Sequence, residues 1–131
     1  MKDGVAILIV EDDLILKNLL TQELSGKYAL SFAMDGEEAL TLFESVKPDL
    51  VLLDLVIPKL SGFEVLEHIR ARKDELRGTP VVVLSNLSQD SDRTRAMQAG
   101  ANRYLVKAEV SIEEIVAQIN RCLPPPSKPS A

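Results

Sequence analysis

The chain has 131 residues, of which 46% are hydrophobic and 27% charged, and its formal net charge is −5. These values fit one soluble domain, and the negative charge argues against direct nucleic-acid binding, which needs a basic face. The single cysteine, Cys122, excludes an internal disulfide and a thiolate metal cluster. No apolar run approaches the roughly 20 residues of a membrane span, and the start of the chain becomes acidic too soon for a signal peptide. We therefore expect a cytoplasmic protein that does not contact the membrane.

Five short, largely apolar segments predict β-strands. They span residues 5–10, 28–33, 50–53, 80–84 and 103–106. The first, third and fourth are continuously apolar, which is typical of parallel strands buried on both faces. The second and fifth are mixed in polarity, which favours the two edges of a sheet.

Segments with helical periodicity fill the gaps between these strands. The predicted helices span residues 13–25, 35–47, 62–78, 90–99 and 111–123. The first is expected to present one apolar stripe, formed by Leu16, Leu19, Leu20 and Leu24. Asp35 with Glu38, and Ser111 with Glu114, have the spacing of a capping box at a helix N-terminus.

The alternation of five strands with five helices predicts a three-layer α/β fold of the doubly wound, flavodoxin-like (βα)5 type. Its parallel sheet is covered by helices on both faces. With the second and fifth strands at the edges, the strand order is 2-1-3-4-5. We expect one domain over residues 1–123, followed at 124–131 by a proline-rich tail that is either a terminus or the beginning of a linker.

Carboxylates follow two of the buried strands directly. Glu11 and Asp12 follow the first strand, and Asp54 follows the third. These strands are neighbours in the predicted order, so the acidic groups face one cleft at the C-terminal edge of the sheet. Carboxylates gathered there repel one another. At neutral pH, therefore, either one of these carboxyl groups has a raised pKa or the group holds a divalent cation. Oxygen ligands favour Mg²⁺ in such a site.

A hydroxyl and an ammonium group are expected at the same edge. Ser85 ends the fourth strand and Lys107 ends the fifth. Acids, a metal ion, a hydroxyl and a lysine are together the groups that phosphoryl transfer requires. The metal and the lysine neutralise phosphoryl oxygens, and an aspartate is a competent acceptor.

At these strand ends the chain resembles the receiver domain of two-component response regulators. The matching motifs are I-L-I-V-E-D-D at 7–13, D-L-V-I-P-K-L-S-G at 54–62, V-V-L-S-N at 82–86 and Y-L-V-K at 104–107. The resemblance covers about residues 5–123. It implies a signalling switch rather than a separate enzyme. It also implies a sensor histidine kinase or phosphotransfer protein as donor, and a downstream effector protein or fused output domain as target. A phosphorylation-dependent homodimer stays open.

The resemblance also implies roles for individual residues. Asp54 is the phosphoacceptor, and Ser85 and Lys107 contact the phosphoryl oxygens. The implied Mg²⁺ ligands are Glu11 through water, Asp12, Asp54 and the backbone carbonyl of Val56. Tyr104 is the switch aromatic, which moves inward as Ser85 is drawn to the phosphate. This movement would reshape the surface formed by the fourth helix, the fifth strand and the fifth helix.

Two positions depart from the family pattern. The family usually has a proline after the lysine, often through a cis peptide bond, whereas Ala108 follows Lys107 here. A cis bond costs roughly 2.5–4 kcal/mol before alanine against about 0.5–1 kcal/mol before proline. We therefore expect a trans bond and a rearranged loop over 107–111. Asn102 and Arg103 stand where the winged-helix transcription-factor class commonly has acids, which weakens the expectation of that class's dimer.

Other functions compete with the phosphorylated switch. A degenerate receiver would act only as a protein-interaction module, without phosphorylation. An aspartyl-phosphate phosphatase would need an acid at Val56, and a flavin carrier would need a phosphate-binding loop in place of residues 11–13. Tyr104 also fits an edge-strand aromatic that covers the core, and Asp13 fits a helix N-cap.

Overall fold

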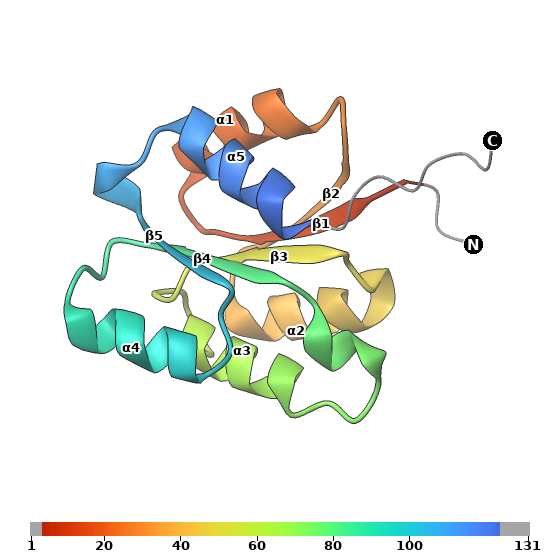
Figure 1. Cartoon of the computed structure of the whole chain (residues 1–131). Coiled ribbons are helices and arrows are strands. Elements are labelled where there is room, and N and C mark those ends of the chain that lie inside the picture. The colour runs from red at the N-terminus through yellow and green to blue at the C-terminus, as the bar shows by residue number, and fades with distance from the viewer. Residues whose placement is uncertain (1–3, 124–131) are drawn as a thin grey trace.

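A computed structural model describes residues 4–123, and its centre is one parallel five-stranded sheet (Figure 1). The strands are β1 (Ala6–Val10), β2 (Ala29–Ala33), β3 (Leu50–Leu53), β4 (Val81–Ser85) and β5 (Arg103–Val106). Their order in the sheet is β2-β1-β3-β4-β5. Each strand begins and ends within one residue of its predicted range, so the predicted fold class and strand order are confirmed. The expected tail at 124–131 lies outside the described residues.

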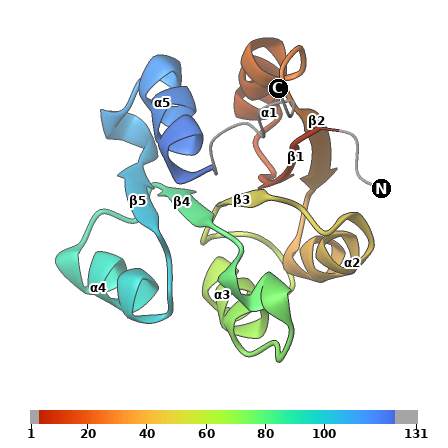
Figure 2. The ribbon, with the colours of Figure 1, turned by 45° about the vertical axis from the view of Figure 1, so that its right-hand side comes forward.

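Helices cover both faces of this sheet. They are α1 (Leu14–Leu24), α2 (Gly36–Val46), α3 (Gly62–Arg70), α4 (Asp90–Gln98) and α5 (Ile112–Cys122), with short 3-10 helices η1 (Glu75–Gly78) and η2 (Lys107–Glu109). Figures 1 and 2 show α1 and α5 on one face and α2, α3 and α4 on the other. Among residues 4–123, no helix combines the length and the apolar character needed to cross a membrane.

The continuously apolar strands are explained by a core on each side of the sheet. In β1, Ile7 and Ile9 pack in the cluster with α1 and α5, whereas Leu8 and Val10 pack in the cluster with α2, α3 and α4. Successive side chains of a strand point to opposite faces. A central strand of this fold therefore has no exposed side on which a polar residue could lie.

The third helix is shorter than the sequence predicts. α3 ends at Arg70, and the segment that contains Leu76 forms the separate helix η1. The Arg72 guanidinium donates to both carboxylate oxygens of Asp74, at 2.9 and 2.6 Å, and one of these oxygens accepts the Leu76 N–H at 3.2 Å. Because residues 72–75 are all charged, they offer no apolar face to bury, and the Asp74 side chain caps a new turn instead.

Two details at helix ends and faces also differ from expectation. Leu19 is 41% exposed, so the buried stripe of α1 is narrower than the four predicted leucines. At α2, Asp35 accepts the Glu38 N–H, but the Glu38 carboxylate accepts from Met34 rather than from Asp35, so the capping box is incomplete. The predicted box at Ser111 is complete.

Candidate acidic phosphoryl-transfer site

The register of the sheet brings two carboxylates together. Val10 of β1 pairs with Leu53 of β3, so Glu11 and Asp54 are the next residues of two adjacent strands. The Asp54 N–H donates to the Val10 carbonyl at 3.0 Å, which extends the ladder to the site itself. Both side chains are buried, with Glu11 3% and Asp54 5% exposed.

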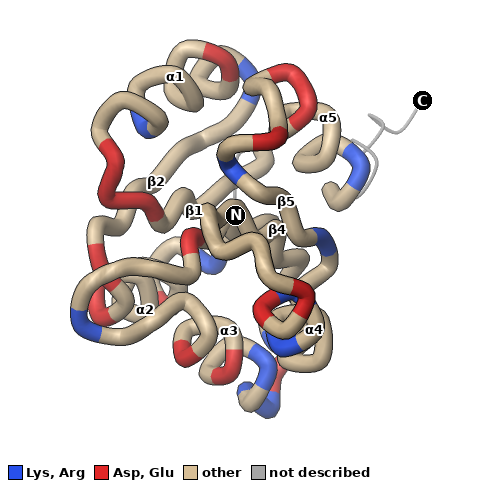
Figure 3. Tube along the Cα trace, turned by 90° about the vertical axis from the view of Figure 1, so that its left-hand side faces the viewer, with Lys and Arg blue, Asp and Glu red and all other residues tan. Residues whose placement is uncertain are grey.

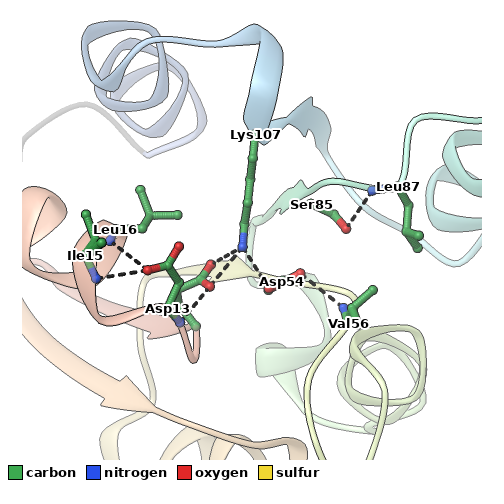
Figure 4. A network of polar contacts seen from close by, with 9 residues as sticks. Asp13, Ile15, Leu16, Asp54, Val56, Ser85, Leu87 and Lys107 are labelled. Carbon is green, nitrogen blue, oxygen red and sulfur yellow. Dashed lines mark hydrogen bonds and ion pairs between the residues drawn. The ribbon is translucent and has the colours of Figure 1, made fainter.

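The hydroxyl predicted for this edge is the last residue of β4, and the predicted lysine directly follows β5. Ser85 pairs with Val106 of β5, so Lys107 directly follows the point where the two paired strands end. The Ser85 hydroxyl oxygen accepts the Leu87 N–H at 3.3 Å. Figure 4 shows the Lys107 side chain extending toward Asp54, with Ser85 on the neighbouring strand.

The Lys107 ammonium bridges the two buried carboxylates. Its Nζ lies 2.9 Å from each oxygen of Glu11 and 2.9 Å from Oδ2 of Asp54. Buried charges are tolerated only when they are paired and hydrogen-bonded, and this ammonium supplies both requirements. The lysine therefore reaches the acids even though alanine follows it. Within the described residues every peptide bond is trans, as expected for Lys107–Ala108.

Burial and the hydrogen bonds between the ammonium and the carboxylates shift the pKa values of Glu11 and Lys107 in opposite directions. Burial raises the pKa of Glu11 above its usual value, and the hydrogen bond from Lys107 offsets only part of this effect. Burial alone would lower the pKa of Lys107, but its hydrogen bonds to Glu11 and Asp54 outweigh this and raise that pKa. The ammonium therefore stays charged through neutral pH.

The acids form a group that can hold a metal ion. Glu11, Asp12 and Asp54 each offer one carboxylate oxygen, and these oxygens lie within 4.8 Å of one another. Asp12 is exposed, and Figure 3 shows the acidic stretch that leads into α1. Such an oxygen donor set, already in contact with one cation at Lys107, fits a hard divalent ion such as Mg²⁺. The Val56 N–H donates to Oδ1 of Asp54 at 3.1 Å, so the loop after β3 adjoins the same group.

A pocket of about 290 Å³ opens beside Asp54. Its lining consists of Asp54, Val56, Asn86, Leu87 and Lys107. Asn86 has no role among the residues predicted from the sequence, although Asn86 directly follows Ser85 and so lies at this edge. The pocket thus has a carboxylate and an ammonium group in one lining.

Tyr104 lies inside the protein and contacts the segment after β4. The side chain is 6% exposed, and its hydroxyl donates to the Leu87 carbonyl at 2.6 Å. The Arg93 guanidinium lies 5.1 Å from the ring centroid. Burial raises the pKa of this phenol. The ring thus covers the core and also bonds to a residue that lines the pocket.

Residues 7–120 match the model of the response regulator receiver domain family. The chain belongs to this family. Response regulator MprA of Mycolicibacterium vanbaalenii is 38% identical to this receiver domain over 120 residues, which cover 91% of this chain and 50% of that protein. The chain thus spans about half the length of the curated relatives it matches.

Solved structures of receiver domains have the same fold. The Francisella response regulator 1452 receiver domain has a TM-score of 0.81 and 26% identity, and the match covers 91% of this chain and 96% of that one. The Mn²⁺-bound form of response regulator Rcp1 has a TM-score of 0.82 and 26% identity, and the match covers 97% of this chain and 100% of that one. This receiver domain is thus a module of two-component signal transduction.

Replacing Lys107 by methionine should destabilise the metal-free receiver domain in a pH-dependent way. Without the ammonium, only the backbone N–H of Asp13 still opposes the effect of burial on Glu11, and the pKa of Glu11 rises further above that of the unfolded chain. Between the pKa of Glu11 in the unfolded chain and its pKa in the folded chain, the folded variant binds more protons than the unfolded one. The stability of the variant therefore falls as pH rises through this interval. We expect a loss of about 3 kcal/mol near neutral pH, at the low end for breaking a buried pair, and a smaller loss at about pH 4.

Urea unfolding of wild type and Lys107→Met in chelator-treated buffer measures this difference. A matched control is Lys27→Met, because Lys27 is an exposed lysine in the turn after α1. An equal loss of stability at both pH values in Lys107→Met would contradict the electrostatic account.

Proposed function

We propose that this receiver domain accepts a phosphoryl group on Asp54 from the phosphohistidine of a sensor histidine kinase or phosphotransfer protein, with Mg²⁺ bound. The observation that carries this proposal is the Lys107 ammonium, 2.9 Å from the Asp54 carboxylate in a pocket that both residues line. An ammonium fixed at this position can neutralise a phosphoryl oxygen while the carboxylate attacks the phosphorus.

The proposed transfer is a displacement at phosphorus. An oxygen of Asp54 forms the new P–O bond while the P–N bond to the donor imidazole breaks, and the imidazole nitrogen keeps the electron pair. Lys107 and the Ser85 hydroxyl would bind phosphoryl oxygens. Bound Mg²⁺ would supply further positive charge to those oxygens. Its ligands would be Glu11 through water, Asp12, Asp54 and the carbonyl of Val56.

We further propose that phosphorylation changes the surface of α4, β5 and α5. The Ser85 hydroxyl would turn to the phosphoryl group and release the Leu87 N–H, which lies 3.3 Å away in this structure. Tyr104 is bonded to the carbonyl of the same Leu87, so movement of this residue would be passed to the ring. Both events would bias one two-state equilibrium, which an effector protein or a fused output domain could detect.

Treatment with acetyl phosphate tests the proposed chemistry on the whole chain. We expect intact-mass analysis to show the gain of one phosphoryl group in wild type with Mg²⁺. Neither wild type in chelator nor the Asp54→Asn variant with Mg²⁺ should gain this mass. Asp49→Asn, which changes an aspartate outside the site, serves as the matched control and should gain the group normally.

No gain in wild type with Mg²⁺ would contradict the proposal and favour a phosphorylation-independent interaction module. Ala108→Pro would then be the first variant to test, because it introduces the residue that the family usually has at this position.

The phosphorylated form should be long-lived. Val56 and Leu87 line the pocket, and neither apolar side chain can orient a water molecule for attack on the phosphoryl group. We expect the double variant Val56→Asn, Leu87→Glu to lose the group several-fold faster, measured as the decay of phosphorylated mass after removal of the donor. Leu19→Asn, an exposed change on α1, is the control. An unchanged lifetime in the double variant would count against this account.

A further inference from the structure

The first turn of α2 is bonded to the loop that joins β3 to α3. Gly36 is the first residue of α2, and its N–H donates to the Pro58 carbonyl at 3.1 Å. The first N–H groups of a helix have no partner within the helix. This bond therefore gives the α2 amide a partner and attaches loop 55–61 to the helix.

Only glycine leaves room for this contact. A Cβ at Gly36 would lie 2.3 Å from the Leu60 carbonyl oxygen and 2.5 Å from the Leu60 Cβ. Both distances are below 3.0 Å, under which the neighbour must shift, and here one neighbour is backbone. The restriction comes from space and not from a left-handed backbone. Any side chain at this position would push loop 55–61 away from α2.

The other polar contacts of loop 55–61 do not replace this one. Gly62 donates its N–H to the Leu55 carbonyl at 2.9 Å and fixes only the ends of the loop. Lys59 lies 3.6 Å from Asp35 and 3.8 Å from Glu37, but its side chain is 57% exposed. Exposed ion pairs at such distances contribute little to stability. Ile57 and Leu60 also pack against the apolar core of this face. The packing of Gly36 on Leu60 therefore sets how closely α2 and the middle of the loop approach each other.

This loop carries part of the proposed metal site. Val56, whose carbonyl we assign to Mg²⁺, is the second residue after Asp54 and is bonded to it through its N–H. Mg²⁺ accepts little deviation from its preferred geometry, so a displaced carbonyl weakens binding. We propose that Gly36 is a positioning residue of the metal site, which allows α2 to hold loop 55–61 in the shape that presents the Val56 carbonyl. This inference rests on the metal site of the proposed function.

Gly36→Ala tests the inference, with Gly78→Ala as its matched control, since a Cβ at Gly78 meets nothing within 4 Å. Calorimetric titration with Mg²⁺ should show binding about tenfold or more weaker in Gly36→Ala, as expected for loss of support behind a ligand. The control should bind like wild type. In acetyl phosphate reactions the Mg²⁺ concentration for half-maximal rate should rise by the same factor, with the rate recovered at saturating Mg²⁺.

A purely structural role would instead lower the rate at every Mg²⁺ concentration, and this result would overturn the inference. Unchanged Mg²⁺ binding in Gly36→Ala, or equal weakening in Gly78→Ala, would overturn it as well. Wild type that binds Mg²⁺ but is never phosphorylated would contradict the proposed function alone, because the calorimetric comparison still decides the role of Gly36. If wild type does not bind Mg²⁺, the inference fails together with the metal site.

Amide hydrogen exchange in wild type provides a second measurement that does not depend on folding of the variant. If the contact supports the metal site, bound Mg²⁺ must in turn stabilise the contact. We expect Mg²⁺ to slow exchange of the Gly36 N–H and to leave the Gly78 N–H unchanged. Equal exchange of the Gly36 amide with and without Mg²⁺ would overturn the inference.

Discussion

The contact of one ammonium with two buried carboxylates is the constraint on which the rest of this structure depends. Glu11 and Asp54 end adjacent parallel strands and are nearly removed from water, so they would repel each other without a cation between them. Lys107, which directly follows the edge strand β5, supplies that cation. In the proposed function, the same positive charge also binds the phosphoryl group. Stability and the proposed chemistry therefore share one group.

The topology of the sheet explains why these groups meet although they are distant in the sequence. Parallel strands place all their C-terminal ends at one edge, and short loops there can carry polar side chains without disturbing the core. The helices behind this edge then determine the shape of the loops. The contact of Gly36 with loop 55–61 is one such case, because a helix that bears no reacting group sets the position of the loop next to Asp54.

The strands and the residues of the candidate site could be predicted because their signals are local. A continuously apolar run followed by an acid, as at Val10–Glu11, specifies both a buried strand and a polar end. The extent of α3 could not be predicted in this way, because the side-chain bond between Arg72 and Asp74 competes with the helix. The bridge from Lys107 to Glu11 and the contact of Gly36 with Leu60 depend on distances between elements that periodicity does not contain.

Chemical mapping of the phosphorylated chain identifies the acceptor carboxylate. Borohydride reduces an acyl phosphate of aspartate to homoserine, so reduction of the phosphorylated chain followed by peptide sequencing in a mass spectrometer marks the modified residue. We expect homoserine at position 54 and intact acids at Glu11, Asp12 and Asp13. Homoserine at position 12 or 13, or a reduced glutamate at position 11, with Asp54 unchanged, would contradict it.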